Sequence, residues 1–320
     1  MTWLEERASN RWPVALIWRD ETGLLVGIWP FIEVPAIGGN GLWPAVSEVA
    51  NLSEPLIDPA SQIDIENIRV GLSLLLKEYC FIWVPLLTET WLKRYLPDYG
   101  KSIGAFARCR ERSRTLYADL AVPQFEDYLS SVVGAKTRKM LRYDTGQLSK
   151  RGPISFRVCK NPAEIQQNWV ELESIEMASW KRTSPDRHLS HPLFRSFYRK
   201  LLPKLAAAGR IEITMLIVGD MAVAFEMGLI GQGYYGLYHI AYLEDFARNS
   251  PGKQLLMHNL ERSHREGRLV FDFMQGNHEY KRRFKTSTEM LSELLLCPRT
   301  VRGALNYYLT RILSRKQKAT

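Results

Sequence analysis

Apolar residues recur at two different periods in the second half of the chain. At first they recur every three or four residues, as on the buried face of an amphipathic helix, and from residue 211 they alternate with other residues, as in a strand. Two glycine-containing segments, 219–220 and 231–233, separate the alternating stretches like tight turns. The pattern predicts two helices, a three-stranded meander, a helix, a strand, a short helix and a final strand, over residues 161–180, 192–208, 211–218, 221–230, 234–242, 250–265, 268–273, 277–284 and 289–297.

The first half repeats part of this order. We predict a hairpin over residues 14–33, a helix over 63–78, a buried strand over 80–86 and a short helix over 89–96. Residues 35–59 are rich in Gly and Pro and are expected to form a loop. The order hairpin, helix, buried strand, short helix therefore occurs twice, although no residue-level repeat is visible. We interpret it as a divergent duplication and expect an α/β (α+β) fold of two tandem units.

Two further helices bridge the halves. One is predicted over residues 123–133, and the next carries six basic residues against the single acid Asp144: Lys136, Arg138, Lys139, Arg142, Lys150 and Arg151. Such a helix is typical of a solvated face between domains or of a contact with RNA phosphates. We place the domain boundaries at 1–122 for the first unit, 123–299 for the second and 300–320 for a basic tail.

Charge limits the classes of function. The 320 residues are 46% hydrophobic and 24% charged, which is ordinary for a globular protein and excludes a disordered or fibrous chain. The net charge is +9, but residues 294–320 hold six basic residues and no acid, so residues 1–293 carry only +3. A nucleic-acid footprint spread over the fold is therefore not expected.

The basic tail has an apolar stripe. Val301, Leu305, Tyr308 and Ile312 fall on one face at helical spacing, among basic residues. A helix of this kind either rests on an anionic membrane surface or packs on its own domain with a basic end. Both interpretations remain open from the sequence.

Cysteines and apolar runs bear on location. The four cysteines lie at least 29 residues apart, with no histidine at ligand spacing, so neither a metal site nor a disulfide framework is expected. The first residues carry acids and no apolar segment, which does not suit a signal peptide, and the longest apolar run, 79–87, is too short to span a bilayer. We expect a cytoplasmic protein that is at most peripheral to the inner face of a membrane.

The start of the predicted helix at residue 250 suits phosphate binding. A helix start exposes unpaired amides and the positive end of the helix dipole. Gly252 would let an anion approach the backbone, while Lys253 and Arg248 supply charge. Ser250 and Pro251 equally suit plain helix capping.

The corresponding helix start in the first half differs. It contains Asp58, Asp64 and Glu66 and no glycine, and acids there would repel a phosphate. If one copy binds a phosphorylated cofactor, we therefore expect it to be the second.

Carboxylates occupy two predicted strands. Asp272 alternates with Phe271 and Phe273, so it faces away from them and needs either a cleft or a partner such as Lys281 or Arg282. Glu226 stands among small residues on one strand face, which suits either a base in a cleft or a solvated sheet face.

Two residues of the next strand are candidates for the same cleft. Tyr238 and His239 are consecutive and should point to opposite faces, so only one of them would reach it. For His239 the alternative is a satisfied, partly buried histidine.

These elements together resemble a known family. The predicted order αα–βββ–α–β–α–β is similar to the GNAT acyltransferase superfamily. More closely, Trp180-Lys181, Ser250-Pro251-Gly252 and the segment 271–284, Phe-Asp-Phe…Gly…Tyr-Lys…Phe, resemble the CelD-type acetyltransferases. That family is associated with cellulose and exopolysaccharide biosynthesis and is similar to the Fem peptidyltransferases, which carry two GNAT-like units. The usual GNAT pyrophosphate signature, Arg/Gln-x-x-Gly-x-Gly/Ala, is met only in part.

The resemblance implies acyl transfer from acetyl-CoA or another acyl-CoA to an amine or hydroxyl, with a saccharide or polysaccharide precursor as acceptor and no metal. Acyl transfer needs a phosphate cradle, a donor for the thioester carbonyl and a base. The implied roles are a base (Glu226, then Asp272), a proton donor (Tyr280), a charge stabiliser (Lys281), cofactor binding (Arg248, Ser250, Gly252, Lys253, Gln254, Asn277) and acceptor binding (Trp180, Tyr238, His239).

Two alternatives stay open. One is Fem-like aminoacyl transfer from a charged tRNA, in which the basic segment 136–151 would contact RNA. The other is a GNAT-folded binding protein of a polysaccharide assembly that has no catalytic activity.

Overall fold

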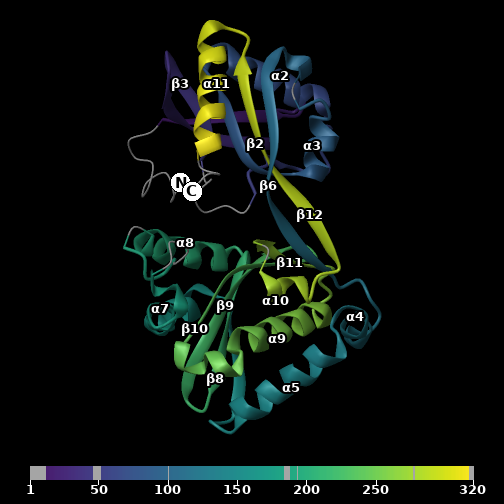
Figure 1. Cartoon of the computed structure of the whole chain (residues 1–320), viewed down its shortest axis with the longest axis vertical. Coiled ribbons are helices and arrows are strands. Elements are labelled where there is room, and N and C mark those ends of the chain that lie inside the picture. The colour runs from purple at the N-terminus through teal and green to yellow at the C-terminus, as the bar shows by residue number, and fades with distance from the viewer. Residues whose placement is uncertain are drawn as a thin grey trace. The chain divides into compact units, whose positions relative to one another are not determined.

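The chain folds into two compact units. The computed structural model describes residues 12–45, 52–99, 101–183, 188–192, 194–276 and 278–316. The first unit is built from the chain up to residue 114 and again from residue 289 onward, and the second from residues 115–288 (Figure 1). The boundaries fall inside two long strands, β6 (Ala105–Asp119) and β12 (Ser287–Pro298).

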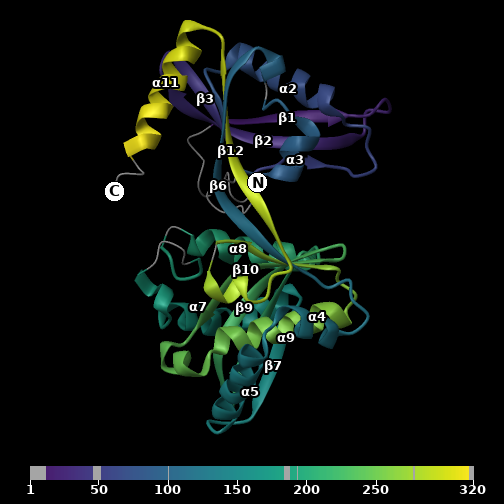
Figure 2. The same ribbon diagram turned by 45° about the vertical axis from the view of Figure 1, so that its right-hand side comes forward.

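The first unit is a mixed sheet with helices on both faces. Its strand order is β1-β2-β3-β5-β12-β6, and β4 pairs with β2. Helices α2 and α3 cover one face and α11 the other (Figures 1 and 2). The bounds are β1 Pro13–Arg19, β2 Leu25–Ala36, β3 Gly39–Pro44, β4 Leu56–Ile57, α2 Ile65–Glu78, β5 Ile82–Thr88, α3 Glu89–Tyr95, a 3-10 turn Lys101–Ile103 and α11 Val301–Lys316.

Each face of this sheet has its own core. Under α2 and α3, Phe31 and Ile82 of the sheet pack with Leu72 and Trp91 of the helices. On the other face a smaller cluster of Val34, Phe81, Leu295 and Cys297 packs with Tyr307 of α11. Burial of these side chains holds the helices to the sheet.

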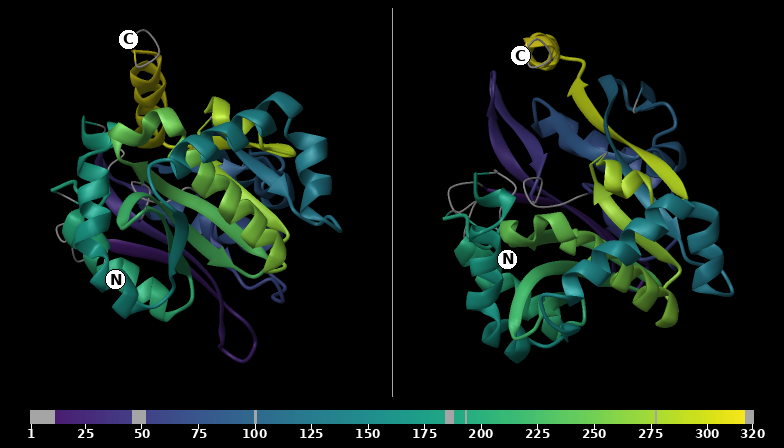
Figure 3. Two further views of the ribbon diagram at one scale, coloured as in Figure 1. Left: turned by 90° about the horizontal axis from the view of Figure 1, so that it is seen from below. Right: turned by 60° about the horizontal axis from the view of Figure 1, so that its bottom comes forward.

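The second unit has the same layered plan. Its strand order is β7-β8-β9-β10-β11-β6, with α4, α5 and α9 on one face and α6 to α8 on the other (Figure 3). The bounds are α4 Phe125–Val132, α5 Ala135–Ser149, β7 Ile154–Cys159, α6 Pro162–Gln167, α7 Trp169–Met177, a 3-10 turn Trp180–Thr183, α8 Arg195–Ala207, β8 Ile211–Val218, β9 Met221–Gly231, β10 Tyr234–Tyr242, a 3-10 turn Glu244–Asn249, α9 Pro251–Arg265, β11 Val270–Gln275 and α10 Glu279–Arg282.

The two units repeat one supersecondary motif. In the first unit β3, α2, β5 and α3 follow one another, and in the second β10, α9, β11 and α10 do. In each motif the strand before the helix pairs in parallel with the beginning of the strand after it, at Leu42↔Ile82 and at Tyr234↔Val270. The fifth residue of the later strand is left-handed in both, with φ of 59° at Leu86 and at Met274. The expected fold of two tandem units with mixed, helix-flanked sheets is confirmed.

The structure divides the chain elsewhere than the sequence analysis did. The predicted boundaries were 122/123 and 299/300, whereas β12 and α11 belong to the first unit. The reason is strand pairing, since β12 runs antiparallel to β5 from Leu291↔Thr88 to Leu296↔Ile82. The tail predicted as a separate segment, 300–320, is therefore continuous with the first unit.

Four strands were not predicted from the sequence. Strands β3 and β4 lie in the predicted loop 35–59; β3 contains two glycines and a proline, and β4 has only two residues. Strand β6 carries arginines at alternate positions, so it has little apolar periodicity to detect, and β7 is short. No helix in the described part of the chain is long and apolar enough to cross a membrane.

Helix α11 packs through a different face from the predicted stripe. Asn306 donates from Nδ2 to the Ile37 carbonyl (3.0 Å) and accepts from the Ile37 amide (3.2 Å). The Tyr307 ring lies 5.7 Å from that of Phe106. Three residues of the predicted stripe, Val301, Leu305 and Tyr308, are exposed instead, and the side chain of the fourth, Ile312, lies outside the described part of the structure.

Candidate functional site

Strands β10 and β11 part after a short parallel ladder. They pair from Tyr234↔Val270 to Gly236↔Asp272 and then separate, while β10 continues to Tyr242. In the same stretch β10 has an irregularity against β9, where the register shifts between Leu237 and His239. A bulge of this kind re-aims side chains at the edge of a site.

The bulge corrects one prediction about β10. Tyr238 and His239 were expected on opposite faces, but both reach the layer of α7 and α8. The Tyr238 hydroxyl lies 2.6 Å from that of Tyr198 on α8, and His239 contacts Glu176 on α7. An extra residue in a strand breaks the alternation on which the expectation rested.

Three buried side chains form a line beside the bulge, which we call the Glu-His-Lys array: Glu176, His239 and Lys181. His239 Nε2 lies 2.6 Å from Glu176 Oε1, and Lys181 Nζ lies 3.1 Å from His239 Nδ1. An ammonium has only donors, so Nδ1 accepts and the ring proton sits on Nε2, which donates to the carboxylate. The array thus places a buried positive charge beside the bulge.

Glu176 is fixed as a carboxylate. Its oxygens also accept from the backbone amides of His188 (2.8 Å) and Ser190 (2.6 Å) and from the Ser190 hydroxyl (2.8 Å). Burial disfavours the charged form, but these hydrogen bonds and the one from His239 outweigh it and lower the pKa of Glu176 to about 2. The His188 ring stacks on Tyr198 and lies 4.4 Å from the His239 ring, which holds the array in place.

Sequence analysis did not include Glu176 among the site residues. The signal was present, because Glu176 follows Leu172 by four residues and so falls on the apolar stripe of its helix. A carboxylate at a core position of an amphipathic helix needs a buried partner.

The charge of Lys181, a member of the array, acts on Lys281. Its ammonium is buried and donates from Nζ to the Gln275 carbonyl at the end of β11 (2.9 Å). Burial lowers the pKa of Lys281 to about 8, helped by the charge of Lys181 and opposed by Asp272 and Glu226. The structure therefore brings Lys281 within the influence of both predicted carboxylates.

Asp272 is saturated with hydrogen bonds. It accepts from the Thr115 hydroxyl (2.6 Å), the Tyr234 hydroxyl (2.8 Å) and the Met274 amide (2.7 Å). Burial raises the pKa of Asp272, against the hydrogen bonds from Thr115 and Tyr234. Phe271 and Phe273 lie in the core on the α9 side, as their alternation with Asp272 predicted.

Glu226 lies on the opposite face, under α9. Its Oε1 accepts from the Tyr235 hydroxyl and from Asn259 Nδ2, both at 2.8 Å, and within the described residues Oε2 has no hydrogen-bond partner. Burial raises the pKa of Glu226 to about 7, against those two hydrogen bonds. The small-residue face expected to line a cleft is covered by the helix, and Gly228 leaves room for the Tyr235 ring to cross it.

The start of α9 departs from plain capping. Ser250 is left-handed, with φ of 49°, and its side chain makes no capping hydrogen bond. Its carbonyl accepts from the amides of Lys253 (2.9 Å) and Gln254 (3.2 Å), and Pro251 has no amide to offer. The Gly252 amide remains as the donor of a helix N-terminus. By contrast, the first-unit helix α2 is capped by Asp64, which accepts from the Asn67 amide.

The other predicted cofactor-binding residues differ in exposure and in their contacts. Arg248 is exposed, and Lys253 reaches Ser250 Oγ at 3.4 Å. The Gln254 side chain turns towards α5, where it accepts from the Thr145 hydroxyl (2.8 Å) and donates to the Leu141 carbonyl (3.3 Å). Asn277 lies outside the described residues.

Two aromatic residues complete the predicted set. Trp180 is exposed, and its ring lies 5.4 Å from Lys181 Nζ. Tyr280 packs against the core under α9, and burial raises its pKa. Among the described residues, no group of three or more His, Cys, Asp or Glu side chains is arranged to hold a metal ion.

Comparison with known proteins identifies the class of the second unit. Residues 135–282 match the acetyltransferase (GNAT) domain family. The matched segment begins with α5 and ends with α10, so it includes the parted strands, the Glu-His-Lys array and the start of α9. The chain therefore contains a GNAT acetyltransferase domain and is an acyltransferase. Comparison with curated proteins finds no match.

Solved structures resemble the chain over both units. FemX is 11% identical, with 97% of this chain and 93% of that one covered and a TM-score of 0.62. L-PGS from Bacillus licheniformis is 14% identical, with 93% and 88% covered and a TM-score of 0.59. At these identities the similarity concerns the fold, and it extends over both tandem units.

Proposed function

We propose that the chain transfers an acyl group, acetyl in the first instance, from a coenzyme A thioester to an amine or hydroxyl of a saccharide or polysaccharide precursor. The observation that carries this proposal is the parting of β10 and β11 beside a β-bulge, with the start of α9 following β10. The CelD-type resemblance of the segments at 180–181, 250–252 and 271–284 supports the saccharide acceptor.

The start of α9 suits the pyrophosphate of coenzyme A. The Gly252 amide lies in the first turn of α9, and a Cβ at that position would lie 3.4 Å from the Ile240 side chain and 3.5 Å from that of Tyr242 on β10. Arg248 and Lys253 add positive charge beside it. When bound, coenzyme A supplies the acyl group as a thioester and leaves as the thiol.

Residues of the chain would supply the base, the charge stabiliser and the proton donor. Asp272 already accepts three hydrogen bonds, whereas Oε2 of Glu226 has no hydrogen-bond partner among the described residues and the pKa of Glu226 is about 7. Glu226 is therefore the better base for the acceptor proton, acting through water because its side chain is fully buried. Lys281 stabilises developing negative charge, and Tyr280 is the proton donor to the departing thiolate, which leaves as the thiol.

We assign binding of the acceptor to the Glu-His-Lys array and its neighbours. Lys181 is held by His239, and through it by Glu176, next to the exposed ring of Trp180. An ammonium and an indole side by side suit the hydroxyls and ring face of a sugar. Tyr238, on the bulge itself, lies with them.

A thermal-shift titration with acetyl-CoA and longer acyl-CoAs tests the donor. A ligand at about a hundredfold its Kd should stabilise the protein by about 2.7 kcal/mol, which moves the melting transition measurably. We expect the shift to disappear in Gly252→Glu and to persist in Gly146→Glu, an exposed glycine of α5 with open space around it. Absence of a shift with every acyl-CoA would overturn the proposed donor.

Aminoacyl transfer from tRNA is the second candidate, favoured by the similarity to FemX over both units. Lys136, Lys139 and Arg142 of α5 are exposed and could meet RNA phosphates. Arg138, by contrast, donates to the carbonyls of Leu129 and Val133 and so holds α4 to α5. Binding to tRNA that weakens steeply with salt and in Lys139→Gln would support this candidate. If the protein binds neither acyl-CoA nor tRNA, the remaining alternative is a GNAT-folded binding protein that has no catalytic activity.

We further propose that α11 rests on an anionic membrane surface, which would place the protein in the cytoplasm at the inner face of the membrane. The helix packs on its own unit through Asn306 and Tyr307, so the stripe of Val301, Leu305 and Tyr308 is left for another surface. The accompanying charge is basic throughout residues 294–320, which complements anionic lipid.

A further inference from the structure

Strand β6 of the first unit carries three arginines on one face. Arg108, Arg110 and Arg112 occupy alternate positions, and alternate residues of a strand point the same way. Their guanidinium nitrogens lie 3.9, 2.9 and 3.3 Å from the carboxylate of one residue, Glu293 on β12. Three positive charges thus converge on a single buried negative charge.

Indole rings adjoin this arginine cluster. Trp83 donates from Nε1 to Glu293 Oε2 (3.4 Å), and its ring lies 5.2 Å from that of Trp43. Helix α11 covers the same face at Phe106, two residues before Arg108. From there the exposed fraction of the arginine side chains rises from 18% at Arg108 to 26% at Arg110 and 39% at Arg112. The charged groups therefore open to solvent away from the helix.

We propose that the arginine cluster, principally Arg110 and Arg112, binds an oxyanion ligand, a phosphate or a carboxylate. Partly buried guanidinium groups repel one another, and the two fork-shaped donor groups of Arg110 and Arg112 share the single carboxylate of Glu293. A bound oxyanion offsets the repulsion and accepts charge-assisted hydrogen bonds from both forks.

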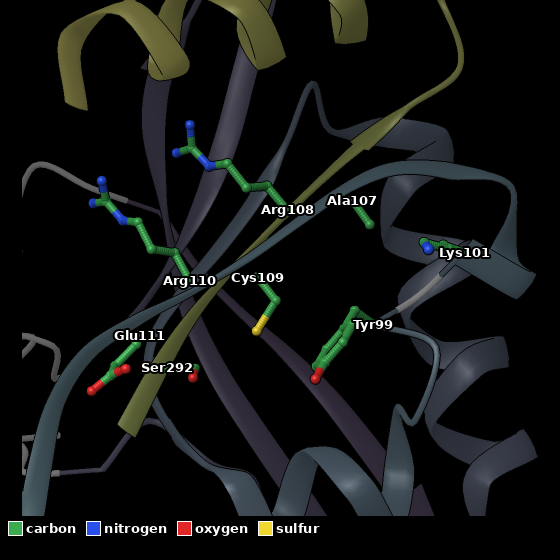
Figure 4. Close-up of a pocket in the computed structure, with 8 residues that line it drawn as sticks. All are labelled: Tyr99, Lys101, Ala107, Arg108, Cys109, Arg110, Glu111 and Ser292. Carbon is green, nitrogen blue, oxygen red and sulfur yellow. The ribbon is translucent and has the colours of Figure 1, made fainter. Parts of the chain in front are cut away.

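A pocket of about 430 Å³ lies along the same stretch of β6, and its lining includes Arg108 and Arg110 as well as Tyr99, Lys101 and Cys109. Figure 4 shows that Arg108 and Arg110 point to one side of the strand, whereas Tyr99 and Cys109 lie on the other. Burial raises the pKa of the Cys109 thiol, so it is not a ready nucleophile. Because the side chains of Arg108 and Arg110 extend away from Tyr99 and Cys109, we place the anion on the arginine face of β6.

Isothermal titration with inorganic pyrophosphate and with citrate tests the proposal. The titrations use the full chain carrying Gly252→Glu, so that the start of α9 does not contribute phosphate binding. We expect the double variant Arg110→Gln/Arg112→Gln to bind at least about tenfold more weakly, as the loss of charge-assisted hydrogen bonds predicts. Arg94→Gln, an exposed arginine of α3, should bind like the parent.

A second variant separates binding from folding. Glu293→Gln removes the internal anion and destabilises the first unit, but the arginines then lack their partner, so pyrophosphate should bind roughly threefold tighter or better. Preference for pyrophosphate or citrate assigns the oxyanion as phosphate or carboxylate. Equal affinities in parent and double variant, or no binding of either anion, would overturn the proposal. If acyl-CoA causes no thermal shift but the anions bind as expected, the proposed acyl donor is wrong and the proposed anion site is supported.

Discussion

His239 donates from Nε2 to Oε1 of Glu176 across 2.6 Å, with both side chains buried. This bond links the bulge of β10 to helix α7, and it fixes the other ring nitrogen, Nδ1, as the acceptor for Lys181. The Glu176 side chain thus acts through His239 on the position of a buried ammonium. The relationship gives Glu176 a positioning role in the proposed reaction.

Removing the Glu176 charge should destabilise the protein in a pH-dependent way. The pKa is about 2 in the fold against an ordinary value of 4.5, so the carboxylate stabilises the fold above about pH 4.5 and this contribution is lost as the pH falls towards 2. The shift corresponds to about 3 kcal/mol. We expect Glu176→Gln to lower the free energy of unfolding by about that amount at pH 7 and by less at pH 3, measured by urea titration.

Glu171→Gln on the same helix is the control. Glu171 is half-exposed and pairs with Arg157 at 3.7 Å, a surface interaction of about 1 kcal/mol or less. If both variants lose the same stability, the buried array does not hold the helix as described.

Glu226→Gln should behave in the opposite sense. The pKa of Glu226 is about 7 in the fold against 4.5, so its contribution to stability is fully present below pH 4.5 and is lost as the pH rises through 7. Glutamine does not ionise, and the variant should therefore gain about 3 kcal/mol relative to wild type between pH 4.5 and pH 8. Turnover should fall by about 100-fold or more if Glu226 is the base. Turnover within a few-fold of wild type in both Glu226→Gln and Asp272→Asn would contradict the assignment.

The pH profile of acyl transfer should depend on the ionisation of Lys281. With a pKa of about 8, its ammonium loses the proton above that pH, and the stabilising charge is lost with it. We expect kcat to fall above about pH 8, and Lys281→Met to lose roughly 100-fold in kcat at pH 7. Arg282→Met, at the exposed neighbouring position, should keep the wild-type profile. An unchanged alkaline limb in Lys281→Met would assign it to another group.

Two glycine-to-alanine variants should differ sharply in stability. At Gly228 an added Cβ would lie 2.3 Å from the Tyr235 ring, which crosses the strand to reach Glu226. At Gly252 the Cβ would meet its neighbours at 3.4 Å or more, an ordinary contact. Gly228→Ala should lose about 1–3 kcal/mol by overpacking, whereas Gly252→Ala should melt at or above the wild-type temperature. Equal melting temperatures would mean that Tyr235 does not need the space.

Vesicle flotation tests the outward face of α11. Vesicles rich in phosphatidylglycerol should retain the protein, and pure phosphatidylcholine vesicles should not, because the helix combines apolar side chains with basic charge. Val301→Glu/Leu305→Glu should abolish binding. Val70→Glu/Leu74→Glu, at similarly exposed apolar positions of α2, should not. Self-association of wild type in light scattering without vesicle binding would assign the stripe to a second copy of the chain.

Local pattern predicted most of the second unit. The strands expected at 211–218 and 234–242 coincide with β8 and β10, because both are rich in apolar, β-branched and aromatic residues and are bounded by glycine-containing turns. The bulge in β10 could not be predicted, since it depends on pairing with β9. The pairing of β12 with β5 was equally hidden, because it joins residues some 200 positions apart. The described site residues inferred by resemblance do not gather at one point, since Glu226 lies under α9 and Asp272 on the opposite face of the sheet, while the buried array includes Glu176, which was not among them.

The interrupted first unit has a consequence for synthesis on the ribosome. Its sheet places β12 between β5 and β6, yet residues 289–298 are made only after the whole of residues 115–288. The second unit is nearly complete as one continuous stretch of nascent chain, whereas the earlier-made strands of the first unit wait for a missing central neighbour. A nascent chain stalled before residue 289 would therefore present two unpaired strand edges, which are the features that chaperones and aggregating partners recognise.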